Sequence, residues 1–200
     1  MTRRTLDVSG LPSYAFGARA PLWWALMLMV AIEGTMLALL ALSYFYVRDR
    51  LSPFPPVSIS RTAAWIATAE MAIWVASVVP TMLQARAARR ESLDGMRLWL
   101  GLATLLGAVA AVLRWYEFHL LPFRWDDTAY GSIVWTLLGL QWVHQLTGVG
   151  ENLLMEAVLF KGPVEKHHCV DVEVTTPLWY FVVSGAVLCW LVVFLPWVIR

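Results

Sequence analysis

The sequence predicts an all-α, polytopic membrane helix bundle with five transmembrane helices, folded as a single domain over residues 1–200. Apolar residues fill 60% of the 200 positions and charged residues only 14%, whereas a soluble domain is about 45–50% apolar and about 25% charged. Five apolar stretches lie near the roughly 20 residues that a transmembrane helix needs. The formal net charge of +1 excludes the basic stripe of a nucleic-acid-binding protein, so no nucleic-acid partner is expected.

The five predicted spans are separated by short polar or proline-containing segments. Pro21 opens the first span, and Arg48, Asp49 and Arg50 close it. Three prolines at positions 53, 55 and 56 exclude a continuous helix between the first and second spans. In lipid the backbone must satisfy its own hydrogen bonds, so each stretch is expected to be a helix. The predicted spans are about 22–47, 63–83, 98–121, 132–160 and 177–199.

Basic residues predict a cytoplasmic N-terminus, because cytoplasmic loops carry an excess of Lys and Arg. The cluster from Arg86 to Arg97 favours this orientation most. The inner face would then hold nine basic residues and the outer face six: inside Arg3, Arg4, Arg19, Arg86, Arg89, Arg90, Arg97, Lys161 and Lys166, and outside Arg48, Arg50, Arg61, Arg114, Arg124 and Arg200. Tryptophans near the span ends, Trp179 among them, are expected to be interface anchors.

Ionisable groups at membrane depth are functional candidates, because they are costly there. Glu33 lies ten residues past Trp23, about 15 Å along the helix and close to the bilayer midplane. It is either a proton-linked group or a neutral acid that ties helices together. Glu70 is expected to pair with an Arg or Gln of a neighbouring helix, or to lie in a polar crevice.

The fourth span carries a polar stripe that falls within one arc of roughly 120° on a helix. Such a stripe must face protein rather than lipid. Interhelical hydrogen bonding is favoured here over proton conduction. The stripe consists of Gln141, His144, Gln145, Gly148, Glu151 and Asn152.

The residues predict no catalytic, cofactor or metal site in this chain. A haem held by two histidines needs two of them at similar depth, and only His144 lies well inside a span. His167, His168 and Cys169, followed by Asp171 and Glu173, are expected to form a solvated polar loop rather than a metal site. With an inner location, His167, His168, Asp171 and Glu173 would buffer protons. The chain is therefore expected to support the chemistry of a partner.

Five strings in this chain together resemble subunit III of the haem-copper oxidases, and the resemblance covers about 21–200. The chain matches the short five-helix bacterial form, because it lacks the two N-terminal helices of the seven-helix form. It departs at Gln141, where the family has a histidine, and at Tyr180 and Val183, where it has His and Asp. The strings are IEGTM (32–36) with SYFY (43–46), WYEF (115–118), DTAYGS (127–132), LGLQWVH (138–144) and WYFVV (179–183).

The resemblance implies a non-redox subunit of a cytochrome c oxidase in the bacterial cytoplasmic membrane. The haems and copper would belong to partner subunits, with subunit I in direct contact and subunit II in the same complex. The complex reduces dioxygen to water and pumps protons, and this chain would stabilise subunit I and assist proton uptake. Glu33 matches the family's buried glutamate, a candidate for proton-linked work or lipid contact, and phospholipids are further candidate ligands.

The same resemblance makes His144 an interhelical donor and Glu117 the partner of Arg114, both structural roles. Alternatives within the family are subunit III of a quinol oxidase and an accessory subunit of a nitric oxide reductase. Outside the family, a small multi-pass transporter or an assembly protein would have the same composition. Haem spectrum, gas substrate and proteoliposome activity separate these alternatives.

Overall fold

The computed structural model describes residues 15–162 and 166–199, and within them every regular element is helical. A short 3₁₀ turn, η1 (Gly17–Arg19), leads into α1 (Pro21–Arg50), α2 (Arg61–Arg89), α3 (Leu93–Leu120) and α4 (Ala129–Lys161). The last run comprises α5 (Lys166–Cys189), the π-helical segment η2 (Trp190–Phe194) and α6 (Leu195–Val198). The predicted all-α class is thereby confirmed.

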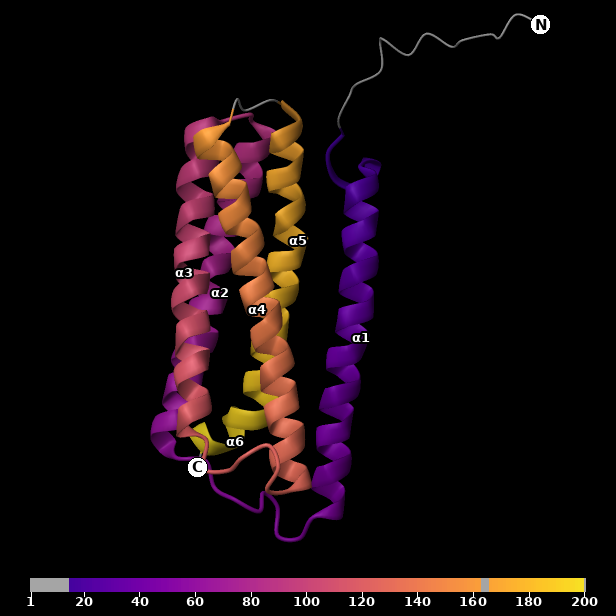
Figure 1. The fold of residues 1–200 in the computed structure, drawn as a ribbon, viewed down its shortest axis with the longest axis vertical. Helices are drawn as coiled ribbons and strands as arrows, with labels where there is room; N and C mark the ends of the chain where they lie inside the picture. Colours follow the sequence, from indigo (N-terminus) through magenta and orange to yellow (C-terminus); the bar gives the residue numbers. More distant parts are fainter. Residues whose placement is uncertain (1–14, 163–165, 200) are drawn as a thin grey trace, which may run out of the picture.

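The long helices run alternately up and down, and α2 to α5 form a four-helix bundle (Figure 1). Helix α1 lies outside this bundle and packs against α4 and α5. It has four buried residues, Leu26, Leu37, Ala41 and Tyr44. The side chains of Ser60 and Thr128 cap α2 and α4 by accepting from the amides of Ala63 and Gly131, as short hydroxyl side chains do at helix starts.

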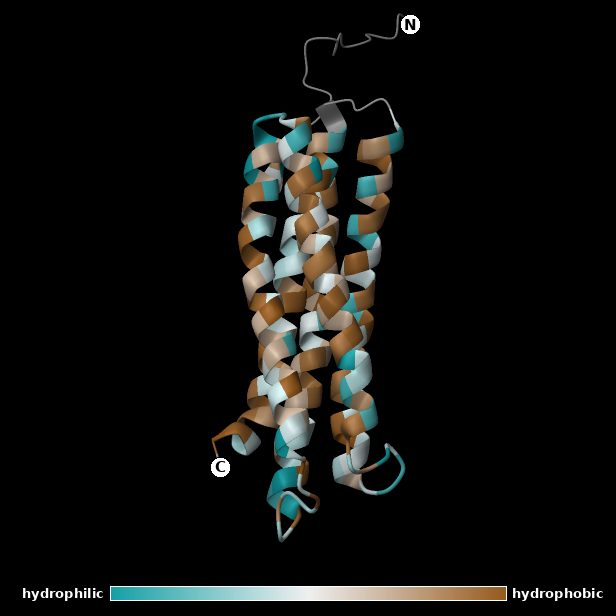
Figure 2. Cartoon of the chain, turned by 90° about the vertical axis from the view of Figure 1, so that its left-hand side faces the viewer, coloured by the Kyte–Doolittle hydropathy of each residue, from teal (hydrophilic) through white to brown (hydrophobic). Residues whose placement is uncertain are grey.

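Four helical runs are long and apolar enough to cross a membrane: Pro21–Arg50, Arg61–Arg89, Leu93–Leu120 and His168–Val198. Apolar residues follow the lengths of the helices, and polar residues gather toward both ends (Figure 2). Helix α4 is equally long but is not among the four, because the polar stripe from Gln141 to Asn152 lowers its hydropathy. A membrane protein is thus supported, whereas the fifth span and the cytoplasmic N-terminus stay predictions.

Small residues let α2 and α3 approach closely. The buried positions of α2 include Ala63, Ala64 and Ala67, and those of α3 include Ala103 and Ala110. Small residues at helix contacts are typical of membrane bundles, where association depends on close packing. These positions bring the charged side chains of α2 and α3 within reach of each other.

Two predictions about α5 are wrong. The helix begins at Lys166 and contains Pro177, which we expected to start it. The residues expected in a solvated loop therefore belong to the first turns of α5. Trp179, expected as an interface anchor, is 1% exposed and donates from Nε1 to Ser77 Oγ at 2.8 Å, because the earlier start places it in mid-helix.

Candidate functional site

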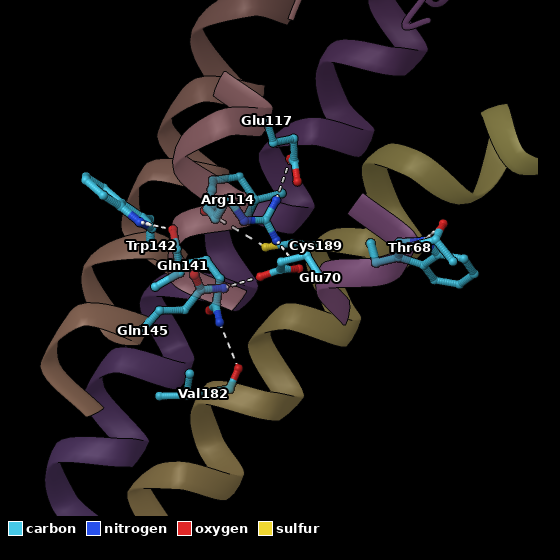
Figure 3. A network of polar contacts seen from close by, with 12 residues as sticks. Thr68, Glu70, Arg114, Glu117, Gln141, Trp142, Gln145, Val182 and Cys189 are labelled. Carbon is cyan, nitrogen blue, oxygen red and sulfur yellow. Dashed lines mark hydrogen bonds and ion pairs between the residues drawn. The ribbon is translucent and has the colours of Figure 1, made fainter. Parts of the chain in front are cut away.

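A buried charge cluster joins α2, α3 and α4 (Figure 3). Arg114 of α3 donates from Nη2 to Glu70 Oε2 of α2 at 2.9 Å and from Nη1 to Glu117 Oε1 at 2.6 Å. Gln145 of α4 donates from Nε2 to Glu70 Oε1 at 2.5 Å. All four residues are fully buried. The sequence left open whether Glu70 meets an Arg or a Gln, and the structure pairs it with both.

Burial of Arg114 corrects one expectation from the sequence. Its side chain is 1% exposed, so it does not lie on the outer face among the basic residues counted there. The six outer residues are reduced to five, against nine inside. The cytoplasmic N-terminus stays a prediction from the Lys and Arg count.

The charge cluster is built so that each partner depends on the others. One guanidinium faces two carboxyl groups, and removal of the guanidinium leaves both carboxyls buried without a cation. A buried charge without a partner is costly. Glu70 is held at both oxygens, whereas Glu117 Oε2 has no hydrogen-bond partner among the described residues. Glu70 is thus held more firmly than Glu117.

Two further contacts attach α4 to its neighbours in the same region. Gln141 donates from Nε2 to the carbonyl of Val182 at 2.7 Å, and Trp142 donates from Nε1 to the carbonyl of Ala111 at 3.1 Å. Gly185 makes room for the first contact, because a Cβ there would collide with Gln141 Oε1. Nothing in the sequence indicated a role for Val182 or Gly185, because every residue has a backbone carbonyl that can accept a hydrogen bond.

The polar stripe of α4 faces protein, as predicted. Gln141, Gln145 and Asn152 are at most 2% exposed, and His144 is 8% exposed. Gly148 is buried as well, and Glu151 is half-buried. Hydrogen bonds from Gln141 and Gln145 cross to α5 and α2. Interhelical bonding therefore accounts for much of the stripe.

A second polar contact joins α1 to the bundle. His144 Nε2 lies 3.2 Å from Glu33 Oε2, and the His144 side chain is 10% exposed against 33% for Glu33. The ring of Phe181 packs edge-on against the imidazole, with the centroids 5.1 Å apart. Glu33 lies about 18 Å and His144 about 22 Å from the start of its helix at 1.5 Å per residue. The contact is therefore far from both ends of the bundle.

The first turns of α5 hold the candidate proton-buffering residues. Glu173 is 6% exposed and accepts from Arg89 Nε at 2.9 Å and from the Gly17 amide at 3.1 Å. It therefore fastens η1 and α2 to α5 and is not a free surface carboxylate. His168 and Asp171 are half-buried, and the side chain of His167 lies outside the described residues.

Within residues 15–162 and 166–199, no three side chains of His, Cys, Asp or Glu are grouped as metal ligands. Cys169 and Cys189 are both buried, and they lie in different core clusters. No protein-family model matches this chain, and a search of curated proteins finds no match to it.

Proposed function

We propose that this chain is the non-redox subunit III of a bacterial respiratory haem-copper oxidase of the cytochrome c oxidase type. The haems and copper lie in the partner subunits, and dioxygen is reduced to water with proton pumping. This chain packs against subunit I, with subunit II in the same complex, in the cytoplasmic membrane. It stabilises subunit I and assists proton uptake.

The observation that supports the proposal most is the contact between Glu33 and His144. The two residues come from two different strings that resemble the family, IEGTM and LGLQWVH, and stand 111 positions apart. A chance likeness of short strings gives no reason for their polar members to meet. The resemblance to a membrane-embedded glutamate thus agrees with a glutamate held by a histidine at mid-depth.

Glu33 is partly exposed on α1, whereas its partner His144 is nearly buried. The Glu33 carboxyl can therefore exchange protons with groups outside the bundle. A carboxyl and an imidazole in contact can share or pass a proton. We propose that Glu33 takes part in proton uptake next to subunit I. Of the four residues proposed to buffer protons on the inner side, Glu173 is held by Arg89 and the Gly17 amide, and the proposal keeps His167, His168 and Asp171.

The decisive experiment is purification of the intact complex through a tag on this chain in mild detergent. Mass spectrometry of the partners and a reduced-minus-oxidised spectrum are then recorded. Copurification of a haem-copper catalytic subunit supports the proposal, and the haem types and electron donor separate a cytochrome c oxidase from a quinol oxidase. Isolation of the chain alone, with transport activity in proteoliposomes, would refute it.

The role of Glu33 is tested by Glu33→Gln in that complex. Glutamine keeps the size and an acceptor oxygen but cannot ionise, so assembly is expected to stay nearly intact while turnover or pumping changes. Glu151→Gln, a half-buried carboxyl of α4, is the matched control and should leave both unchanged. Wild-type proton uptake and turnover lifetime in Glu33→Gln would contradict the role while leaving the subunit assignment intact.

A further inference from the structure

A pocket of about 590 Å³ opens between the C-terminal end of α1 and the end of the chain. It lies in the range of small-molecule sites, about 300–1,000 Å³. Tyr44 and Phe45 line it from α1, Phe54 from the following loop, and Leu191 and Pro196 from η2 and α6. Three separate segments thus enclose an apolar hollow.

The local backbone of the C-terminal segment helps to form this hollow. Pro196 has no amide hydrogen, and its ring collides with the carbonyl four residues earlier in a regular α-helix. The residues before it, Trp190–Phe194, form a π-helix, a widened turn that is frequent at functional sites. Leu191 and Val192 of this turn face the pocket, and Leu191 is 46% exposed.

One charged side chain lines the pocket. Arg48 is exposed, and it forms no ion pair with any other described residue. Arg50, two residues further along α1 and outside the pocket lining, stacks on the ring of Tyr46 with its guanidinium carbon 5.1 Å from the centroid. Both cations suit the last turn of α1, but only Arg48 combines that place with the apolar hollow.

The pocket also lies where two candidate membrane-spanning runs end. Pro21–Arg50 ends beside it, and His168–Val198 supplies its other wall. A cation at the end of a transmembrane helix is at the level of lipid headgroups, with acyl chains further toward the membrane centre. At this level, an apolar hollow beside a guanidinium that forms no ion pair fits a phospholipid. The acyl chain of such a lipid is apolar, and its headgroup carries a phosphate.

We propose that this pocket binds one anionic phospholipid, with an acyl chain in the hollow between α1 and the C-terminal segment and its acidic headgroup at Arg48. A guanidinium binds phosphate oxygens through two parallel hydrogen bonds. The rings of Tyr44, Phe45 and Phe54, together with Leu191, would surround the acyl chain of the lipid. The site requires only that the protein is embedded in lipid, so it is independent of the oxidase proposal.

The test titrates phosphatidylglycerol into the purified full-length chain, or into the complex with which it purifies, and counts bound lipid by native mass spectrometry. Phosphatidylcholine with the same acyl chains serves as the zwitterionic probe. The wild-type protein is expected to bind one phosphatidylglycerol more tightly than phosphatidylcholine. Arg48→Gln removes both hydrogen bonds of the guanidinium and should weaken phosphatidylglycerol binding at least about tenfold, the scale of a single charge-assisted hydrogen bond, and remove the preference.

Arg50→Gln is the matched control, because it removes a cation of the same turn outside the pocket, and it should change binding less than about twofold. Leu191→Trp fills the hollow and should weaken both lipids. Far-UV circular dichroism verifies that the variants fold. Equal binding of the two lipids by the wild type, or equal effects of the two arginine variants, would overturn the proposal.

Discussion

Removal of the Arg114 guanidinium is expected to be the most destabilising single change in the charge cluster. Arg114→Met keeps an unbranched apolar stem but removes the guanidinium and with it both contacts, to Glu70 at 2.9 Å and to Glu117 at 2.6 Å. Two charge-assisted hydrogen bonds of about 1.5–3 kcal/mol each give about 3–6 kcal/mol. Breaking a buried ion pair costs about 3–5 kcal/mol. We expect a loss of about 3–5 kcal/mol in the free energy of unfolding.

Removal of the two carboxyl partners should lower the free energy of unfolding by unequal amounts. Glu70→Gln affects a side chain held at both oxygens, whereas Glu117→Gln affects one held at Oε1 only. The loss should therefore fall in the order Arg114→Met, Glu70→Gln, Glu117→Gln. The triple variant should be more stable than Arg114→Met by about 1 kcal/mol or more, because it no longer buries unpaired carboxylates.

The assay is unfolding of the purified chain in mixed micelles with increasing dodecyl sulfate, followed by circular dichroism and tryptophan fluorescence. Trp74 and Trp179 report on the core, since they are at most 1% exposed and pack with centroids 5.1 Å apart. A loss below about 1 kcal/mol for Arg114→Met, the scale of an exposed pair, would refute the reasoning. A triple variant no more stable than the single one would refute the role of the buried charges.

Three further variants test the packing and the end of the bundle. Gly107→Ala should cost about 1–3 kcal/mol in the same assay, because its Cβ would lie within 3 Å of the Trp179 ring. Gly139→Ala has open space and should be neutral or stabilising by up to about 1 kcal/mol; equal losses at both glycines would contradict the steric cause. Glu173→Gln should speed amide hydrogen exchange in η1 and cost about 1 kcal/mol, because Arg89 is exposed; unchanged exchange would show that the carboxylate does not hold the turn.

The sequence predicted the helical class because each stretch is long, apolar and ended by charges or prolines. It also predicted which face of α4 is buried, since the polar residues share one arc. It misplaced the start of α5, because the charged run from Lys166 to Glu173 looks like a loop until Arg89 and the Gly17 amide satisfy Glu173. At this end of α5, contacts from distant residues stabilise a helix that the local composition did not predict.

The charge cluster was predicted only in part for a related reason. Arg114 and Glu117 are three positions apart, so their pairing follows from helix geometry. The contact from Arg114 to Glu70 spans 44 positions, and no periodicity within one helix points to it. Which long-range partner a buried carboxyl meets is decided by how α2 and α3 pack, through the small residues between them.

The position of α1 at the edge of the bundle has a consequence for synthesis. This helix is made before its docking partners α4 and α5, and His144 follows Glu33 by 111 residues. At about 5–20 residues per second, His144 is translated roughly 5–20 s after Glu33. During that time α2 and α3 are made, but the two helices against which α1 packs are not yet complete. The nascent chain thus passes through a stage in which α1 has been made but has not yet docked.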